Sequence, residues 1–289
     1  MKTILYATDC TKNDASALKY VYHFSRIMKA DLHIIHVYDL PPVSVSVIQR
    51  SEVLKRNINL ELKHVVSKYC EAHLKNELRE KPITIHAIES VSVEKAIINL
   101  SKKIGSDLVV LGIKDSHSHR GLFSSNIANV LLDKIEVPIM MLPNGLIYNT
   151  ISTIIYATDF DQEDILPIKN LIEIVRPFEA LVEIVHIYRT DTTTAKEKME
   201  QFKAQLLEQI LYQNMTFKTI AASKIKMGLL SVIDDENASM LAMVERKHHL
   251  SLDNLFHKDL VKDMEDKVAV PILAFNKKNI EKNLEMVEA

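Results

Sequence analysis

The chain has 289 residues, of which 47% are hydrophobic and 26% charged, and its formal net charge at pH 7 is −2. This composition is ordinary for a soluble globular protein of about two domains, and the small charge argues against a general nucleic-acid binder, which usually presents a basic face. No apolar run approaches the ~20 residues of a membrane span, no apolar signal stretch opens the chain, and two cysteines supply no disulfide framework. We therefore expect a cytoplasmic protein that binds neither nucleic acid nor membrane.

In the first half, short apolar runs alternate with segments of helical periodicity. Asn13 or Asp14 can cap the first helix, and Gly105 stands where a C-cap glycine belongs. Continuous apolar strands that alternate with helices indicate a parallel sheet covered on both faces. The pattern predicts strands at 3–7, 31–38, 82–88, 108–112 and 138–142, and helices at about 13–28, 44–78, 93–104 and 123–135.

The second half repeats this order after a linker near residues 143–150. We expect one domain over residues 1–146, a second over 150–276, and a polar tail at 277–289. Strands are predicted at 153–157, 180–188, 216–222, 239–244 and 271–275, and helices at 163–176, 193–213, 228–237 and 253–268.

Three segments of the first half recur in the second. Thr3-Ile-Leu-Tyr-Ala-Thr-Asp9 returns 150 residues later as Thr153-Ile-Ile-Tyr-Ala-Thr-Asp159, and Ile34-Ile-His-Val-Tyr38 returns at the same offset as Ile184-Val-His-Ile-Tyr188. A Val-Pro-Ile run at 137–139 returns at 270–272 and closes each half. The second half is therefore a shortened copy of the first.

These features resemble the universal stress protein family. The resemblance rests on the Ala-Thr-Asp ending of strand one, the His-Val-Tyr ending of strand two, the strand at 108–112 with its polar loop and helix, and the closing Val-Pro-Ile-Met-Met-Leu strand. The second half resembles degenerate domains of tandem members from Bacteroidetes-type bacteria. The resemblance implies an α/β fold of two doubly wound domains, each a five-stranded parallel sheet in the flavodoxin-like order 3-2-1-4-5, with ligands at the carboxyl ends of strands one and four.

Nucleotide-binding members of the family carry Gly-x2-Gly-x9-Gly-(Ser/Thr) after strand four. Glycines there let the backbone approach the phosphates, which backbone N–H groups and a helix N-terminus then hold. Gly112 matches the first glycine, but Asp115 takes the place of the second, and Ser125 and Asn126 take the last two positions. A carboxylate about 4 Å from a phosphate charge is repulsive by ~1 kcal/mol in water and ~4 kcal/mol at an effective dielectric constant near 20.

The family's adenine and ribose contacts carry over to Asp9 and Val37, so the adenosine end of the site is more intact than the phosphate end. If this site takes a cofactor, the resemblance implies ATP. In the second half, Asp159 and Ile187 keep the adenosine positions, but the loop at 244–249 has no glycine.

Each of these residues also has a structural reading. Asp9 and Asp159 can cap the turns that follow their strands. His36 and His186 lie inside strands, where packing with a hydrogen bond is expected, and Cys10 is expected to be an ordinary small residue whose pKa the neighbouring Asp9 raises. His117 and His119 have metal-ligand spacing, but no accompanying ligand set, so a solvated loop is expected.

Three classes of function are weighed against the sequence. The first is a non-enzymatic stress-response regulator with at most a weak, degenerate adenine-nucleotide site in the first half, or in a stronger form an ATP- or AMP-binding sensor. The second, an ATP-cleaving enzyme, is not expected, because residues 7–11 lack the required glycine-rich loop. The third is an interaction module without a ligand. We also expect an unidentified protein partner and a pseudo-dimer within the chain through the two closing strands; association into a homodimer stays open.

Overall fold

The computed structural model describes residues 1–11, 14–40, 52–75, 82–113, 125–190, 192–245 and 268–276. Spatial contacts divide the chain into two compact units. The first unit contains Lys2–Leu131 and Asn144–Tyr148, and the second contains Leu132–Pro143 and Asn149–Ala289 together with Met1. Residues 132–143 thus cluster with the second unit, although the repeat assigns them to the first half. The domain limits expected from the repeat stay a prediction, and the tail lies outside the described residues.

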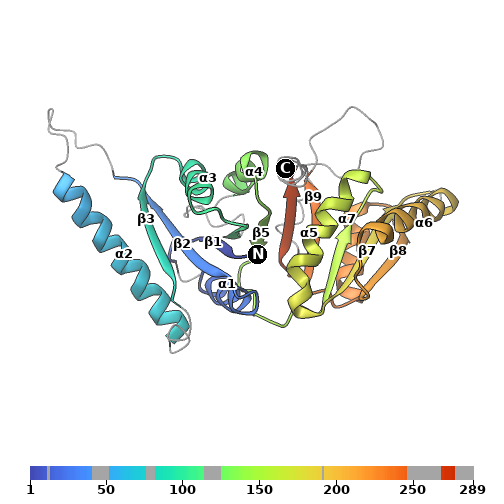
Figure 1. The fold of residues 1–289 in the computed structure, drawn as a ribbon, viewed down its shortest axis with the longest axis horizontal. Coiled ribbons are helices and arrows are strands. Elements are labelled where there is room, and N and C mark those ends of the chain that lie inside the picture. Colours follow the sequence, from blue (N-terminus) through green and yellow to red (C-terminus); the bar gives the residue numbers. More distant parts are fainter. Residues whose placement is uncertain are drawn as a thin grey trace. The chain divides into compact units, whose positions relative to one another are not determined.

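The first unit is a parallel sheet with helices on both sides. Its strands have the order β3-β2-β1-β4. Figure 1 shows α1 and α2 on one side of these strands and α3 on the other. The chain order is β1 (Thr3–Ala7), α1 (Ala15–Ile27), β2 (Asp31–Tyr38), α2 (Glu52–Leu74), β3 (Thr84–Glu89), α3 (Val93–Ile104) and β4 (Leu108–Gly112), followed by α4 (Ser125–Lys134), which contains the boundary between the units.

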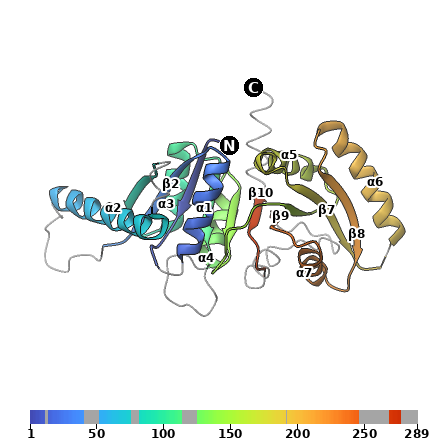
Figure 2. The ribbon, with the colours of Figure 1, turned by 90° about the horizontal axis from the view of Figure 1, so that it is seen from below.

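The second unit repeats this architecture and has two further strands, β10 and β5. Its strands have the order β5-β10-β9-β6-β7-β8, all parallel to their neighbours except β5, which is antiparallel to β10. Figure 2 shows α5 and α6 on one side of the sheet and α7 on the other. The elements are β5 (Ile139–Leu142), β6 (Thr153–Ala157), α5 (Ile165–Val175), β7 (Leu181–Tyr188), α6 (Thr192–Gln209), β8 (Met215–Ala221), α7 (Ile225–Asp235), β9 (Met240–Glu245) and β10 (Ile272–Asn276).

The predicted α/β fold is confirmed, and most strands lie within one or two residues of their expected limits. The helix expected from residue 228 begins at Ile225 instead, so Gly228 lies inside the helix and not at its start. A Cβ atom at Gly228 would lie 2.8 Å from Ile187 Cγ2, so the glycine lets α7 approach β7 closely. The helix expected at 253–268 lies outside the described residues, as does the start of the helix expected at 44–78.

The pairing of the two closing strands is confirmed. Met141 lies opposite Ile272, and Met140 opposite Leu273, in an antiparallel pair whose residues are buried. The Asn276 side chain extends this contact by donating hydrogen bonds to the carbonyls of Leu132 and Ile135, at 2.7 and 3.0 Å. Neither closing strand carries a charged side chain, and each would expose an apolar edge if it were unpaired. Their pairing covers both edges.

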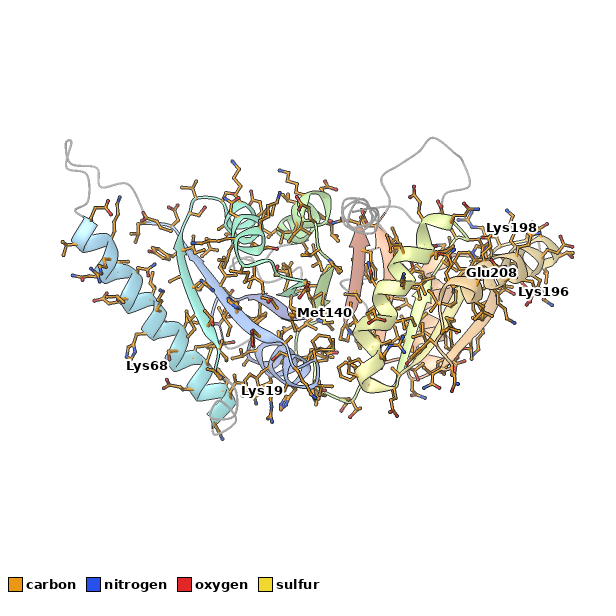
Figure 3. The ribbon with its side chains drawn as sticks, viewed as in Figure 1. Lys19, Lys68, Met140, Lys196, Lys198 and Glu208 are labelled. Atoms are coloured by element: carbon orange, nitrogen blue, oxygen red, sulfur yellow. The ribbon has the colours of Figure 1, made fainter. Side chains whose placement is uncertain are left out.

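Helix amphipathicity explains how the outer layers attach. In α6 the buried side chains are Ala195, Met199, Phe202 and Leu206, which recur at intervals of three or four residues and form one stripe. Figure 3 shows the labelled Lys196, Lys198 and Glu208 on the outside of the same helix. Met140, which is also labelled, belongs to β5 and is fully buried.

Candidate functional site

The strand order brings three of the predicted site residues to one edge of the first unit. Because β1 lies between β2 and β4, the carboxyl ends of these three strands are adjacent. Asp9 follows β1, Val37 is the penultimate residue of β2, and Gly112 ends β4. Ser125 and Asn126 begin α4, but their side chains lie outside the described part of the structure, as does the loop that contains Asp115.

Val37 offers its backbone rather than its side chain. The residue as a whole, backbone and side chain together, is 1% exposed. The pairing of β1 with β2 ends at Ala7 and Ile35, and the next backbone contact is the Thr8 N–H to the Ile35 carbonyl, at 3.0 Å. Backbone groups alternate in direction along a strand, so the N–H and C=O of Val37 point the same way as those of Ile35, past the last paired residue of β1. A planar ligand edge with a donor and an acceptor can be recognised by such a pair of groups.

Asp9 shapes the turn that closes this edge. Its Oδ1 accepts a hydrogen bond from the Thr11 backbone N–H at 3.1 Å, the turn contact expected from the structural reading of this residue. Cys10 has a φ of 59°, in the left-handed region where residues other than glycine are uncommon. The Cys10 N–H is held by the Thr8 hydroxyl at 3.0 Å, so side chains on both sides maintain this strained conformation.

The Asp14 carboxylate is buried beneath this turn, at the same edge of the sheet. Sequence reasoning did not place it there. Asp14 is only 6% exposed, and its Oδ2 accepts a short hydrogen bond from the hydroxyl of Thr8, which is fully buried. Asp14 occupies the N-cap position of α1, but its side chain makes no cap hydrogen bond there. The carboxylate joins the turn to the start of the helix through Thr8 and does not cap the helix. Its recurrence as Asp164, 150 residues later, was the available signal.

Gly112 has a contact that the nucleotide motif does not account for. A Cβ atom at this position would lie 2.3 Å from Asp14 Oδ1 and 3.4 Å from Ala17 Cβ. The absence of a side chain therefore makes room for the Asp14 carboxylate at the end of β4. Its role toward a phosphate group stays a prediction.

His36 has the packing role that its position in a strand predicts. Its Nδ1 donates to the Thr8 carbonyl at 3.1 Å, and Cys10 Sγ lies 3.9 Å from the same nitrogen. Burial, with smaller contributions from Asp14 and Asp9, raises the pKa of the Cys10 thiol to about 12. The predicted direction is confirmed, but burial rather than Asp9 is the main cause. A thiol with so high a pKa is a poor nucleophile near neutral pH.

The second unit reproduces this arrangement of hydrogen bonds but has different side chains around it. Thr158 donates to Asp164 at 2.6 Å, and His186 Nδ1 donates to the Thr158 carbonyl at 2.8 Å. Phe160 replaces Cys10 at the left-handed position, with a φ of 69°, and its ring centroid lies 4.0 Å from that of His186. Val244, the penultimate residue of β9, takes the place of Gly112. This unit thus retains the fastening of the turn and fills its surroundings with apolar side chains.

Among the described residues, no group of three or more His, Cys, Asp or Glu side chains could hold a metal ion. No helix in that same part of the chain combines the length and apolarity that crossing a membrane requires. The predicted loop positions His117 and His119 lie outside it.

Comparisons with known proteins agree with this architecture. A model of the universal stress protein family matches residues 1–143. A universal stress protein from Archaeoglobus fulgidus is 15% identical, with a TM-score of 0.67 over 95% of this chain and 98% of its own. A candidate universal stress protein from Pseudomonas aeruginosa is 14% identical, with a TM-score of 0.63 over 99% and 97% of the two chains. The predicted likeness to Bacteroidetes-type members stays untested.

The same fold also occurs in a different setting. The cytoplasmic domain of a prokaryotic cation chloride cotransporter is 11% identical to this chain, with a TM-score of 0.52 over 97% of this chain and 99% of that one. No curated protein matches the chain. At such identities the solved structures show the fold alone, and function must be argued from the site.

Proposed function

The chain belongs to the universal stress protein family, whose model matches residues 1–143, and from this premise we propose that it is a non-enzymatic regulator of a stress response whose first half binds the adenosine part of a nucleotide weakly. The observation that carries the proposal is the backbone of Val37, which points past the last paired residue of β1 beside the Asp9 turn. A purine edge presents donors and acceptors that such backbone groups can pair with.

The phosphate end supports weak rather than tight binding. Close approach of a backbone to phosphates requires glycines, and the chain keeps Gly112 but has Asp115 and Ser125 at the two later glycine positions. Gly112 already accommodates the Asp14 carboxylate, whose Oδ1 lies 2.3 Å from the place of a Cβ atom. A second negative charge near that carboxylate is unfavourable.

A regulatory rather than catalytic role fits the chemistry of the described strand ends. Cys10 is the nucleophile nearest to a histidine there, but burial raises its pKa to about 12, and His36 Nδ1 already donates to the Thr8 carbonyl. A base that is engaged through the nitrogen facing the thiol does not activate it. The output would then pass to a protein partner, which the sequence does not identify, and two chains could associate further into a homodimer.

The proposal is tested by titration calorimetry with adenosine and with ATP, each with and without magnesium. We expect weak adenosine binding and no gain from the phosphates. The double variant Asp115→Gly with Ser125→Gly should bind ATP about ten-fold or more tightly than the parent, which is ~1.4 kcal/mol, and leave adenosine binding nearly unchanged. No adenosine binding by the parent would contradict the proposal.

Tight ATP binding by the parent would instead favour the nucleotide-sensor alternative, in which other donors replace the missing glycines. Mass analysis of small molecules released from freshly purified, denatured protein gives an independent measurement. It would show whether an adenine nucleotide travels with the chain, and which one.

A further inference from the structure

Two histidines on neighbouring strands of the first unit are joined directly to one another. His33 is the third residue of β2 and His86 the third residue of β3. Their rings are nearly parallel, 10° apart with centroids at 5.2 Å, and His33 Nδ1 lies 2.9 Å from His86 Nε2. At this distance one imidazole donates an N–H and the other accepts it, so the bond requires that at least one of the two facing nitrogens carries no proton.

The second unit has a different pair at the same two positions. Register places Ile35 opposite His86 in the first unit and Val185 opposite Lys218 in the second, and Glu183 occupies the place of His33. Lys218 Nζ lies 3.0 Å from Glu183 Oε1, and the Thr216 hydroxyl donates to the same oxygen at 3.2 Å. Lys218 also bonds to Glu236, and this bond raises its pKa. Carboxylates and ammonium groups ordinarily keep their charges between pH 5 and 8, whereas imidazoles do not.

We propose that the His33–His86 pair is an acid-sensitive connection between β2 and β3, and that Glu183–Lys218 is its acid-insensitive counterpart in the second unit. This role is separate from the proposed nucleotide site, since the pair lies near the amino ends of its strands and the site at the carboxyl ends. Acidification would loosen β3, which is the outermost strand of its sheet.

The charges around the pair determine how it responds. Within the described residues, the charged groups that act on it are Asp31 on β2, near His33, and Lys63 on α2 and Lys103 on α3, near His86. Asp31 favours a first proton on His33, and the pair then remains joined by a charge-assisted N–H···N bond. A second proton makes both facing nitrogens donors, places two positive charges side by side beside the lysines, and breaks the bond.

The sign of the pH dependence follows from burial. Burial lowers the pKa of His33 and of His86 below the ordinary value of 6.5, and for His86 the neighbouring cations add to this. The unfolded chain therefore binds protons before the folded chain does. The stability that the pair contributes is fully present above a pH of about 6.5 and is lost as the pH falls toward the lowered values.

Amide hydrogen exchange at residues 84–89 and 215–221, corrected for the intrinsic rate at each pH, tests the proposal. Between pH 7.5 and 5, exchange in β3 should rise about ten-fold, and exchange in β8 should rise less. The variant His33→Gln with His86→Gln, whose amides do not titrate, should lose most of the rise in β3. His186→Gln is the matched control, since burial also lowers the pKa of His186, but it lies in the other unit.

An equal rise in β3 in the parent and in the double glutamine variant would overturn the proposal. If that variant does not fold, the imidazole resonances of the parent decide the matter instead. Two coupled titration steps below 6.5 are expected, and independent titration of the two rings near 6.5 would overturn the proposal. As a converse, Glu183→His with Lys218→His should make β8 acid-sensitive.

Discussion

At the end of β1 the Thr8 hydroxyl donates to Asp14, and at the end of β6 the Thr158 hydroxyl donates to Asp164. Both turns then place a residue in the left-handed region, and in both a histidine of the next strand donates to the threonine carbonyl. The groups around this frame differ. The first unit has Gly112 and Cys10 where the second has Val244 and Phe160.

The direction of the carboxylate shows what the difference means. Asp14 Oδ1 lies where a side chain at Gly112 would be, whereas Asp164 Oδ1 accepts from the Tyr156 hydroxyl at 3.2 Å in the unit that has Val244. The shared hydrogen bonds of the turn are therefore structural, because they persist whether small or large side chains surround them. Capacity for a ligand depends on the residues around them, and only the first unit keeps small residues there.

The largest effect is expected from removal of the buried carboxylates. Asp14→Ala and Asp164→Ala each leave a fully buried threonine hydroxyl without this acceptor and should cost about 2–4 kcal/mol. Urea unfolding, with hydrogen exchange at β1 and β6 as local probes, measures both. Similar losses would support a shared frame, and a variant within about 0.5 kcal/mol of the parent would break the comparison.

A smaller loss is expected where α7 meets β7. Gly228→Ala puts a methyl group 2.8 Å from Ile187 Cγ2 and should cost about 1–3 kcal/mol. Ile187→Val in the same chain removes Cδ1, which lies 3.1 Å from the place of that methyl group, and should recover part of this loss. The first half has Val37 and Ala96 at the corresponding positions. The melting temperature is the readout, and Met227→Ala on the exposed face of α7 is the control. A rescue that fails would mean that another neighbour limits the space.

Gly112→Ala should cost about 1 kcal/mol, since the atom it displaces is the end of a side chain that the second unit shows in another direction. The cost should largely disappear in an Asp14→Ala background, which a double-mutant cycle measures. Equal costs in both backgrounds would show that Ala17 or the backbone, and not Asp14, demands the glycine.

A further prediction, on a different scale, concerns reactivity rather than stability. Because burial raises the pKa of Cys10 and of Cys70 to about 12, only a minute fraction of either thiol is ionised at pH 8. Alkylation by iodoacetamide in the folded protein should be roughly 1,000-fold slower than in the denatured chain. Alkylation of Cys10 at the rate of a free thiol would contradict its assignment as an unreactive packing residue.

The sequence predicts the strands well for a physical reason. The run at Thr3–Ala7 recurs at Thr153–Ala157, which doubles its signal, and the run at Leu108–Gly112 has no polar side chain. Contacts made in three dimensions are harder to foresee. Asp14 is of a residue type that commonly caps helices, and only the folded chain shows that its carboxylate accepts a hydrogen bond from Thr8. Gly112 fits a phosphate motif in the sequence, whereas its contact with Asp14 requires α1 to be in place.

The same limit applies to the histidines. Alternation along a strand predicts that His33 and His36 face opposite sides, but the bond from His33 to His86 depends on the register of β2 with β3. Register is determined by packing and by the connections between strands, and the segment before β3 gives no sequence signal for it.

The central claim is that a ligand site survives in the first half alone, at the Asp9 turn. Titration calorimetry with adenosine on Asp9→Ala, with Asp159→Ala as the matched variant in the other half, tests it most directly. We predict weak binding of one adenosine per parent chain, a loss of about ten-fold or more in affinity in Asp9→Ala, and no change in Asp159→Ala. Binding that is lost in Asp159→Ala and kept in Asp9→Ala would contradict the claim.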